Sequence, residues 1–239
     1  DVNHDFSSER TYKPPKKLFC YRYFIEFFRV ILPSTLFIFM AGIITGITSD
    51  MQIERDLSEL ILWFPLLYIG VSIIGIFATA LLKWIIVGKY VPQNKPLWSG
   101  FVWRSELITG LYENFLVLFC LNILTGTPFI KYPLRLLGCK IGKRTCLFTT
   151  QITEFDLIHV HDYAALNDNC TMQTHLFEDR VMKMSYVTLE ENCSVGGMSV
   201  VLYDSKMEKN AILDPLSVLM KNETLSADNR YIGAPAKKI

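Results

Sequence analysis

The sequence lacks an excess of charge of either sign and lacks any closely paired cysteines. Its 239 residues hold 24 lysines and arginines against 23 aspartates and glutamates, a formal net charge of +1. Such a balance gives no general attraction for a polyanion, and no basic run alternates with aromatic residues, so nucleic-acid binding is not expected. Six cysteines without a CxxC pair favour reduced core thiols over a disulfide framework or a zinc site. They are Cys20, Cys120, Cys139, Cys146, Cys170 and Cys193.

Charge is also missing from two long stretches of the chain. No charged residue occurs from Val30 to Ser49 or from Leu60 to Leu82. Each run has about the 20 residues that a helix needs to cross about 30 Å of hydrocarbon. A short polar loop separates them, so the pattern predicts a transmembrane α-helical hairpin over residues 19–92. The alternative is a pair of helices buried in a large soluble core.

The flanking charges predict how this hairpin is oriented. Basic residues precede the first run and follow the second, whereas the loop between them is mainly acidic. By the positive-inside rule both termini and the domain that follows lie on the cytoplasmic side of a plasma or inner membrane. Residues 1–18 are polar and contain Pro14 and Pro15, which is typical of a linker or tail. The chain begins at Asp1, so we expect it to be a piece of a longer protein.

Residues 93–137 form a second, less uniform apolar region. Arg104, Glu106 and Glu113 interrupt it, and its longest uncharged part starts at Phe115 and soon meets Gly126-Thr127-Pro128. This favours an amphipathic, interfacial or re-entrant helical region over a third crossing. A helix packed under the soluble domain is an equal alternative, and the two are compatible.

From residue 138 to 239 the sequence advances in six-residue steps, each with an aliphatic residue followed by a small or polar one. Three such steps make one triangular coil of a parallel β-helix, with the aliphatic residues stacked along its axis. The period slips at residues 153–160, 178–187 and 204–213, where we expect loops. A β-sandwich is the alternative, but its strands would recur every eight to twelve residues with more turn glycines.

Several segments carry a resemblance to a known family. They include Gly126-Thr127-Pro128 and the polar tract from Gln173 to Arg180, with further matches at residues 96–99, 102–104, 134–138, 149–150, 153–156, 165–167 and 199–204. Together they resemble the membrane-linked C-terminal hexapeptide-repeat (condensing) domain of nonribosomal peptide synthetases, as in ε-poly-L-lysine synthetase. The chain departs from that pattern at His161, where a glycine is expected, and it holds no adenylation or carrier segment.

The resemblance implies a fold and an activity. The fold would be a left-handed parallel β-helix of the trimeric LpxA-like class, as a homotrimer or a pseudo-trimer with sibling repeats. The activity would be acyl transfer from an amino acid carried as a phosphopantetheine thioester to an acceptor amine, with a carrier domain as partner and no cofactor bound directly. A noncatalytic membrane scaffold that docks a carrier protein is the alternative function.

The tract around His175 holds the candidate catalytic residues. A histidine with an ordinary pKa near 6.5 can accept a proton from an amine at neutral pH, so His175 is the candidate general base. Glu178 or Asp179 is expected to orient its imidazole, and Arg180 to bind a pantetheine phosphate or a substrate carboxylate. A solvated turn with internal ion pairs explains the same residues without catalysis.

Other polar residues give weaker candidates for substrate binding. If residues 153–156 are extended, Glu154 and Asp156 share one side and together hold a substrate ammonium group. Asn167 is a further substrate-binding candidate, with an internal asparagine ladder as its alternative. A metal-dependent hydratase is a further alternative, because His159 and His161 share one side of an extended segment and His175 follows by about one coil. No spacing fixes a third ligand, however, and no metal is expected.

Overall fold

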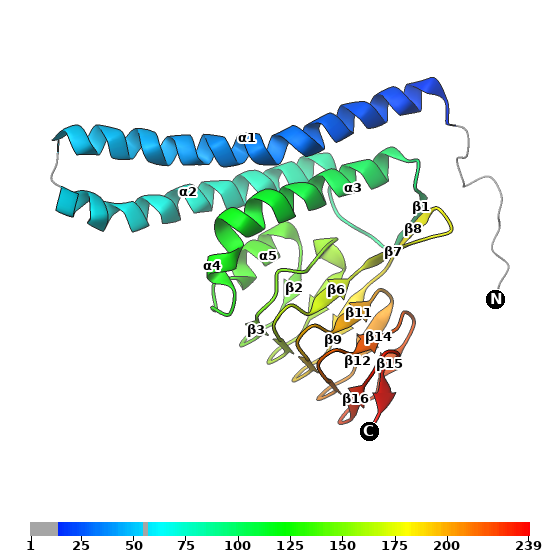
Figure 1. The fold of residues 1–239 in the computed structure, drawn as a ribbon. Helices are drawn as coiled ribbons and strands as arrows, with labels where there is room; N and C mark the ends of the chain where they lie inside the picture. Colours follow the sequence, from blue (N-terminus) through cyan, green and yellow to red (C-terminus); the bar gives the residue numbers. More distant parts are fainter. Residues whose placement is uncertain (1–13, 55–56) are drawn as a thin grey trace.

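The computed structural model describes residues 14–54 and 57–239, and it consists of a layer of helices above a tapering stack of short strands (Figure 1). Helices α1 (Lys16–Glu54) and α2 (Leu57–Ile86) run antiparallel, and α3 (Gly100–Leu111) lies beneath them. The distal halves of α1 and α2 extend beyond the rest of the protein (Figure 1).

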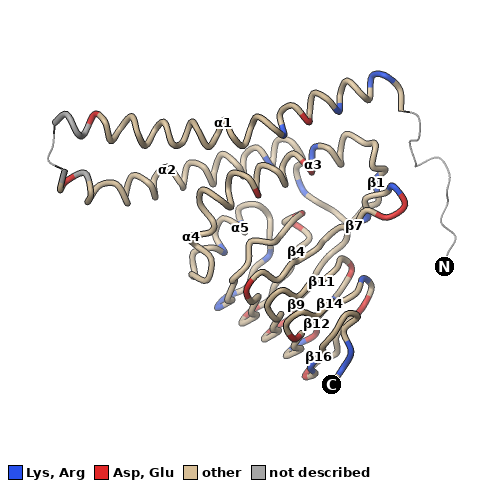
Figure 2. The backbone as a smooth tube through the Cα atoms, in the orientation of Figure 1, with Lys and Arg blue, Asp and Glu red and all other residues tan. Residues whose placement is uncertain are grey.

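The two long helices contain the predicted charge-free runs. Segments Lys16–Asp50 and Ile61–Ile86 are long and apolar enough to cross a membrane, with only 17% and 11% of their most apolar windows buried. Lys, Arg, Asp and Glu are almost absent from their projecting halves (Figure 2). Segment Gly100–Leu124 also qualifies by length and composition, but 56% of its window is buried. These helices fit membrane association, and the orientation stays a prediction.

The element bounds can be set beside the predicted regions, whose limits stay a prediction. Helix α1 begins at Lys16, inside the predicted tail, and the first thirteen residues of that tail lie outside the described part. The region predicted at 93–137 holds a strand and four helical segments. Besides α3, they are β1 (Gln93–Pro96), the π-helix η1 (Tyr112–Leu121), α4 (Asn122–Leu124) and α5 (Lys131–Leu137). Ser99 caps α3, since its Oγ accepts a hydrogen bond from the Val102 amide.

Below the helices the chain forms a parallel β-helix with three sheets. The first sheet holds β2 (Lys140–Ile141), β4 (Ile158–Val160), β9 (Val187–Leu189), β12 (Ser205–Met207) and β15 (Thr224–Leu225). The second holds β3 (Cys146–Leu147), β5 (Ala165–Leu166), β10 (Ser194–Val195), β13 (Ile212–Leu213), β16 (Arg230–Ile232) and the antiparallel β17 (Lys237–Lys238). The third holds β6 (Thr171–Gln173), β11 (Val200–Leu202) and β14 (Val218–Leu219).

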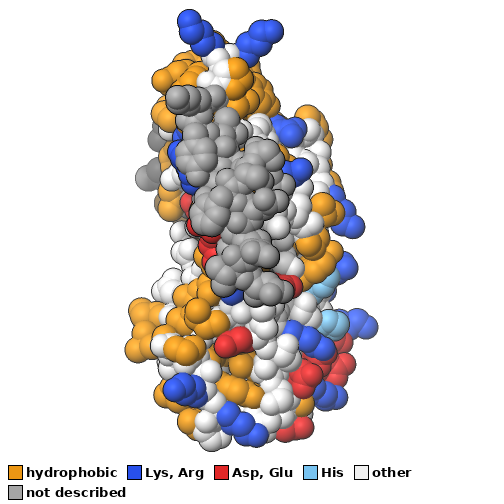
Figure 3. All heavy atoms as spheres, turned by 90° about the vertical axis from the view of Figure 1, so that its right-hand side faces the viewer, with side chains coloured by type: hydrophobic (Ala, Val, Ile, Leu, Met, Phe, Trp, Pro, Cys, Tyr) orange, Lys and Arg blue, Asp and Glu red, His pale blue; other side chains and the backbone are white. Residues whose placement is uncertain are grey.

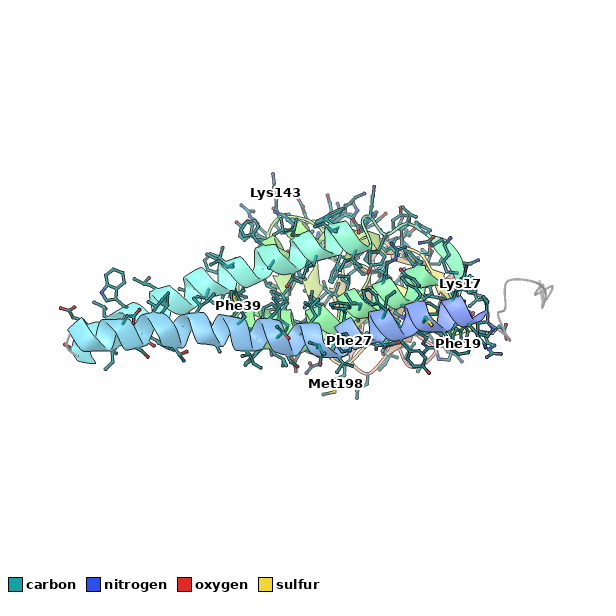
Figure 4. All side chains as sticks on the ribbon, turned by 90° about the horizontal axis from the view of Figure 1, so that it is seen from above. Lys17, Phe19, Phe27, Phe39, Lys143 and Met198 are labelled. Atoms are coloured by element: carbon teal, nitrogen blue, oxygen red, sulfur yellow. The ribbon has the colours of Figure 1, made fainter. Side chains whose placement is uncertain are left out.

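The register of these strands fits the six-residue repeat. Ser194 pairs with Ile212 and Val200 with Val218, so the coils in this part of the β-helix advance by 18 positions, three steps of six. All pairs within the three stacked sheets are parallel except β16 with β17, which excludes the β-sandwich alternative. From above, Lys143 and Met198 project from opposite sides of this stack (Figure 4). The left hand and the trimer stay predictions.

Corners of the β-helix use left-handed backbone where the sequence supplies asparagine and aspartate. Asn192, Asn210 and Asp228 have φ of 59°, 61° and 57° at one corner of successive coils. These residue types tolerate that conformation better than branched ones. Asn192 Nδ2 donates to Asn210 Oδ1 at 3.1 Å, and Asn210 Nδ2 donates to Asp228 Oδ1 at 2.6 Å. The polar ladder therefore ties the coils together outside the aliphatic core.

Two of the three predicted slips are real. Near residues 153–160 the register lengthens by one position, since Lys140 pairs with His159, and a 3₁₀ turn η2 (Phe155–Leu157) occupies the corner. Between β6 and β9 a hairpin is inserted, so Thr171 pairs with Val200, 29 positions on. The slip expected at 204–213 is wrong. β12 and β13 keep the 18-residue register, because the polar residues there form an ordinary corner.

The cysteines are all free, as expected, but not all lie in the core. Cys120, Cys139, Cys170 and Cys193 are buried. Cys20 and Cys146 are exposed, and for Cys146 the cause is strand alternation, because its neighbour Leu147 takes the inward position.

Candidate active site

The inserted hairpin carries the tract around His175 and holds it under the helical layer. Its strands are β7 (His175–Glu178) and β8 (Val181–Met184), and β8 also pairs antiparallel with β1. Met184 is opposite both His175 and Gln93. The segment that leaves α2 therefore fixes the strand next to His175.

His175 forms a close pair with a buried carboxylate. Its Nδ1 lies 2.7 Å from Oε2 of Glu154, whose side chain is almost fully buried. The Thr174 hydroxyl donates to the same oxygen at 2.6 Å, and the Ser105 hydroxyl reaches the other oxygen at 3.5 Å. With Nδ1 bound to a carboxylate, Nε2 is the nitrogen left for a reactant, the tautomer that a general base requires.

The two groups shift each other's pKa in opposite directions. Burial lowers the pKa of His175, but the hydrogen bond and negative charge of Glu154 outweigh it and raise that pKa above 6.5. Burial would raise the pKa of Glu154, but the hydrogen bond and charge of His175, with the hydroxyl of Thr174, bring it below 4.5. The imidazole is therefore a stronger base than a free histidine.

This pair lines a cavity of about 660 Å³ between α1, α3, η1 and the hairpin. Its wall holds three carboxylates besides Glu154, namely Glu26, Glu106 and Glu113. Arg29 of α1 balances part of that charge, since its guanidinium lies 3.2 Å from Glu106 and 3.3 Å from Glu26. Carboxylates thus outnumber basic groups in the cavity, which favours a cationic ligand.

The residues predicted to orient His175 lie elsewhere. Side chains alternate along β7, so His175 and Phe177 share a face while Glu178 points to the other. Glu178 instead binds Lys183, at 3.0 Å, and Lys221. Asp179 sits at the exposed hairpin turn with φ of 51°. Glu154, from the preceding coil, takes the orienting position that the sequence assigned to Glu178 or Asp179.

Glu154 and Asp156 do not act together, contrary to the prediction. Glu154 has a left-handed backbone and begins the η2 turn, so the extended geometry assumed for this segment is absent. Asp156 points away from the cavity and lies 2.6 Å from Nζ of Lys83 and 3.0 Å from the backbone N–H of Tyr90. The Lys83 and Asp156 side chains are 0% and 5% exposed, which leaves Asp156 no access to a substrate.

Two further candidates can be placed. Asn167 ties two coils together, since its Nδ2 donates to the Val195 carbonyl at 2.8 Å. Its other contact is with the Ser194 hydroxyl rather than with an asparagine, and its role in substrate binding stays a prediction. Arg180 is exposed at the hairpin turn with φ of 64°, and its role in phosphate binding stays a prediction.

The histidines do not converge. His159 packs its ring on Tyr186, 4.8 Å between centroids, and the charges of Lys140 and His161 add to burial in lowering its pKa. Histidine is visible at the surface among basic and acidic groups in Figure 3. His161 is exposed and lines a shallow surface pocket together with Glu190. Within residues 14–54 and 57–239 no three His, Cys, Asp or Glu side chains are grouped as a metal site requires.

The acidic side chains that line the cavity were not among the site residues predicted from the sequence. Glu106 and Glu113 are seven residues apart, hence on one helical face, a pattern that could have identified them. Glu26 and Arg29 precede an apolar run and read only as flanking charges. No local pattern signals that α1 closes over the hairpin.

No protein-family model matches the chain. The chain is 40% identical over 230 residues to Delta-poly-L-ornithine synthetase of Acinetobacter baumannii (strain AB307-0294). That match covers 95% of this chain but 17% of the synthetase, so the chain corresponds to a small part of that protein.

Solved structures with a similar β-helix include two acetyltransferases. A hexapeptide-repeat-containing acetyltransferase from Vibrio cholerae O1 biovar eltor, solved with acetyl coenzyme A, is 14% identical with a TM-score of 0.40, over 50% of this chain and 81% of that one. A maltose O-acetyltransferase from Clostridium difficile 630 is 15% identical with a TM-score of 0.39, over 49% and 79%. Because these TM-scores are below 0.5, we assign the β-helix fold from the strand register alone.

Proposed function

We propose that this chain is an acyltransferase module that forms amide bonds, with His175 as general base and Glu154 as its orienting partner. The observation that carries the proposal is the 2.7 Å contact between these side chains at the wall of a cavity of about 660 Å³. The acyl donor would be an amino acid held as a thioester on a phosphopantetheine carrier. Similarity to a synthetase supports this assignment.

The geometry fits transfer of an acyl group from a thioester to an amine. The attacking amine nitrogen bonds to the thioester carbonyl carbon while Nε2 of His175 takes a proton from that nitrogen. The C–S bond then breaks, and the imidazolium returns the proton to the departing thiolate. The products are an amide and a free thiol, so the reaction needs no oxidant or reductant. Glu154 stabilises the transient imidazolium, and the cavity holds the two reactants together.

The acidic wall supports an acceptor that carries a second ammonium group. Glu106 and Glu113 line the cavity with His175, and Arg29 is the basic side chain among them. The relative is named as a synthetase of poly-L-ornithine, and ornithine has such a second amine. Glu106 or Glu113 would bind the amine that does not react, while His175 deprotonates the one that does.

Arg180 fits the carrier side of the reaction. It lies at the turn of the hairpin, just beyond the strand from His175 to Glu178, whose three steps span roughly 10 Å. A pantetheine arm can bridge a distance of that size. Its phosphate would then meet the guanidinium while its thioester reaches the imidazole.

The direct test supplies a synthetic aminoacyl-pantetheine thioester and ornithine to the purified full chain and measures the amide product by mass spectrometry. We expect His175→Ala to lower the rate by about 10²–10⁴-fold, the usual contribution of a general base. His161→Ala is the matched control, since that histidine is exposed outside the acidic cavity. Equal product from wild type and His175→Ala would favour the docking scaffold instead.

A further inference from the structure

We propose that the corner joining η1 to α5 is re-entrant: it enters the bilayer that the α1–α2 hairpin is predicted to span, and returns on the same side. The corner comprises residues 115–132, and we propose that it contacts the acyl chains of one leaflet. The inference is independent of the catalytic proposal. It rests on depth, exposure and backbone hydrogen bonding.

The depth of the corner can be estimated from its contacts with the hairpin. The ring of Phe119 lies 5.5 Å from that of Phe37, and the Tyr68 hydroxyl donates to the Phe119 carbonyl. Phe37 follows Arg29 by eight residues, so it lies about 12 Å along α1 from that last charge. Tyr68 is likewise well inside the charge-free run of α2. Phe119 therefore shares the level of residues that lie inside both charge-free runs, which the predicted hairpin places in the hydrocarbon.

The corner has no charge of its own at that level. Residues 115–130 contain no Asp, Glu, Lys or Arg, and charge returns at Lys131. The Lys131 ammonium lies over the ring of Tyr132, 5.4 Å from its centroid. A lysine and a tyrosine side by side are typical of the interface between lipid and water.

The outer face of the corner is apolar and exposed. Leu118, Ile123, Phe129 and Tyr132 are 61%, 64%, 62% and 57% exposed. Phe148 belongs to the same surface, because its ring packs against Gly126. A Cβ atom added at Gly126 would lie 2.7 Å from the Phe148 ring. Single exposed apolar residues need no explanation, but a contiguous group indicates a contact surface. Phe119 in the same corner contacts Phe37 of α1 and Tyr68 of α2, and both helices are lined with exposed apolar side chains, which favours the bilayer as the partner.

The backbone N–H groups of the turn at residues 125–129 are hydrogen-bonded within the protein, as a medium without water requires. In lipid every free N–H costs several kcal/mol, so irregular segments must bond internally. Thr125 N donates to Leu121 O, Gly126 N to Leu147 O and Thr127 N to Leu124 O, at 3.1, 2.8 and 3.0 Å. Phe129 N donates to the Thr127 hydroxyl at 3.3 Å, and Pro128 has no N–H. All N–H groups from 125 to 129 are thus bonded.

A photocrosslinking experiment tests the proposal. Phe129 is replaced by p-benzoylphenylalanine in the full chain, which is reconstituted in vesicles of phosphatidylethanolamine and phosphatidylglycerol, irradiated and analysed by mass spectrometry. We expect lipid adducts from position 129. The matched control is Met198, which is also 62% exposed but lies on the β-helix, and no lipid adduct is expected there.

The same analogue at Phe39, on the projecting part of α1, reports whether the hairpin itself is inserted (Figure 4). Lipid adducts at 39 with none at 129 above the Met198 level would overturn the re-entrant corner. Adducts between position 129 and a second copy of the chain would also overturn it, since the surface would then be an interface between copies. The analogue at Ile123 repeats the test if the variant at 129 fails to fold.

Discussion

Two acid–base pairs, made by carboxylates two residues apart, differ in what surrounds them. Glu154 binds His175 at 2.7 Å, and Asp156 binds Lys83 at 2.6 Å. Both carboxylates are buried. However, the His175 side chain keeps 14% exposure at the wall of a cavity, whereas that of Lys83 has none.

The difference lies in the chemistry that each pair allows. A histidine changes charge near neutral pH and has a second nitrogen for a reactant, so an open histidine pair can move a proton. A sealed lysine pair holds a fixed geometry. Asp156 joins α2, the Tyr90 amide and the η2 turn, and η2 begins at Glu154. The closed pair therefore positions the open one.

The largest effect on this comparison is expected from Asp156→Asn. It leaves the Lys83 ammonium buried without its counter-charge, and breaking such a pair costs about 3–5 kcal/mol. The thermal midpoint of the purified protein in detergent micelles should fall sharply. Lys206→Met is the control, because its pair with Glu190 is on the surface. Equal midpoints for the two variants would show that the buried pair has no structural role.

Glu154→Gln should keep the fold but weaken the base. Without the carboxylate the imidazolium loses its stabilising charge, and we expect a rate lower by about 100-fold or more. Glu154 raises the pKa of His175, so its loss lowers that pKa. The rate, which rises as His175 loses its proton, should then reach its plateau at lower pH than in wild type. A slower enzyme with an unchanged pH profile would contradict the pairing.

Glu106→Gln should act on binding rather than on proton transfer. A lost contact with an ammonium group is worth about 1.4 kcal/mol, a tenfold increase in KM for a diamine acceptor. An acceptor with a single amine should show no such increase, which provides an internal control. Steady-state kinetics with both acceptors measure the split, and equal changes for both would remove Glu106 from the acceptor site.

The smallest effect is expected from Glu178→Gln, although the sequence marked this residue as catalytic. Its contacts with Lys183 and Lys221 are partly exposed, and such pairs contribute less than about 1 kcal/mol. Rate and pH profile should stay at wild-type values. A loss comparable to that of Glu154→Gln would return Glu178 to the catalytic role.

The sequence predicted those elements of the fold that follow from a pattern repeated along one segment. Charge-free runs marked the long helices, and six-residue steps marked the coils, because each signal repeats along one segment. For His175 it predicted Glu178 or Asp179 as the partner, whereas the imidazole contacts Glu154. Glu154 reaches His175 from the preceding coil, and Lys83 meets Asp156 across 73 positions. Contacts of this kind depend on the left-handed turn at Glu154 and on the inserted hairpin, which no repeat pattern specifies.

Strand β1 has a mechanical consequence. It follows α2 after a short connection and pairs with β8, the strand whose other neighbour carries His175. A tilt of the helical hairpin relative to the β-helix would therefore pull on the imidazole through two rows of backbone hydrogen bonds. For a hairpin that spans a bilayer, as predicted, the bilayer thickness sets the tilt of the long helices and would thereby act on the position of His175.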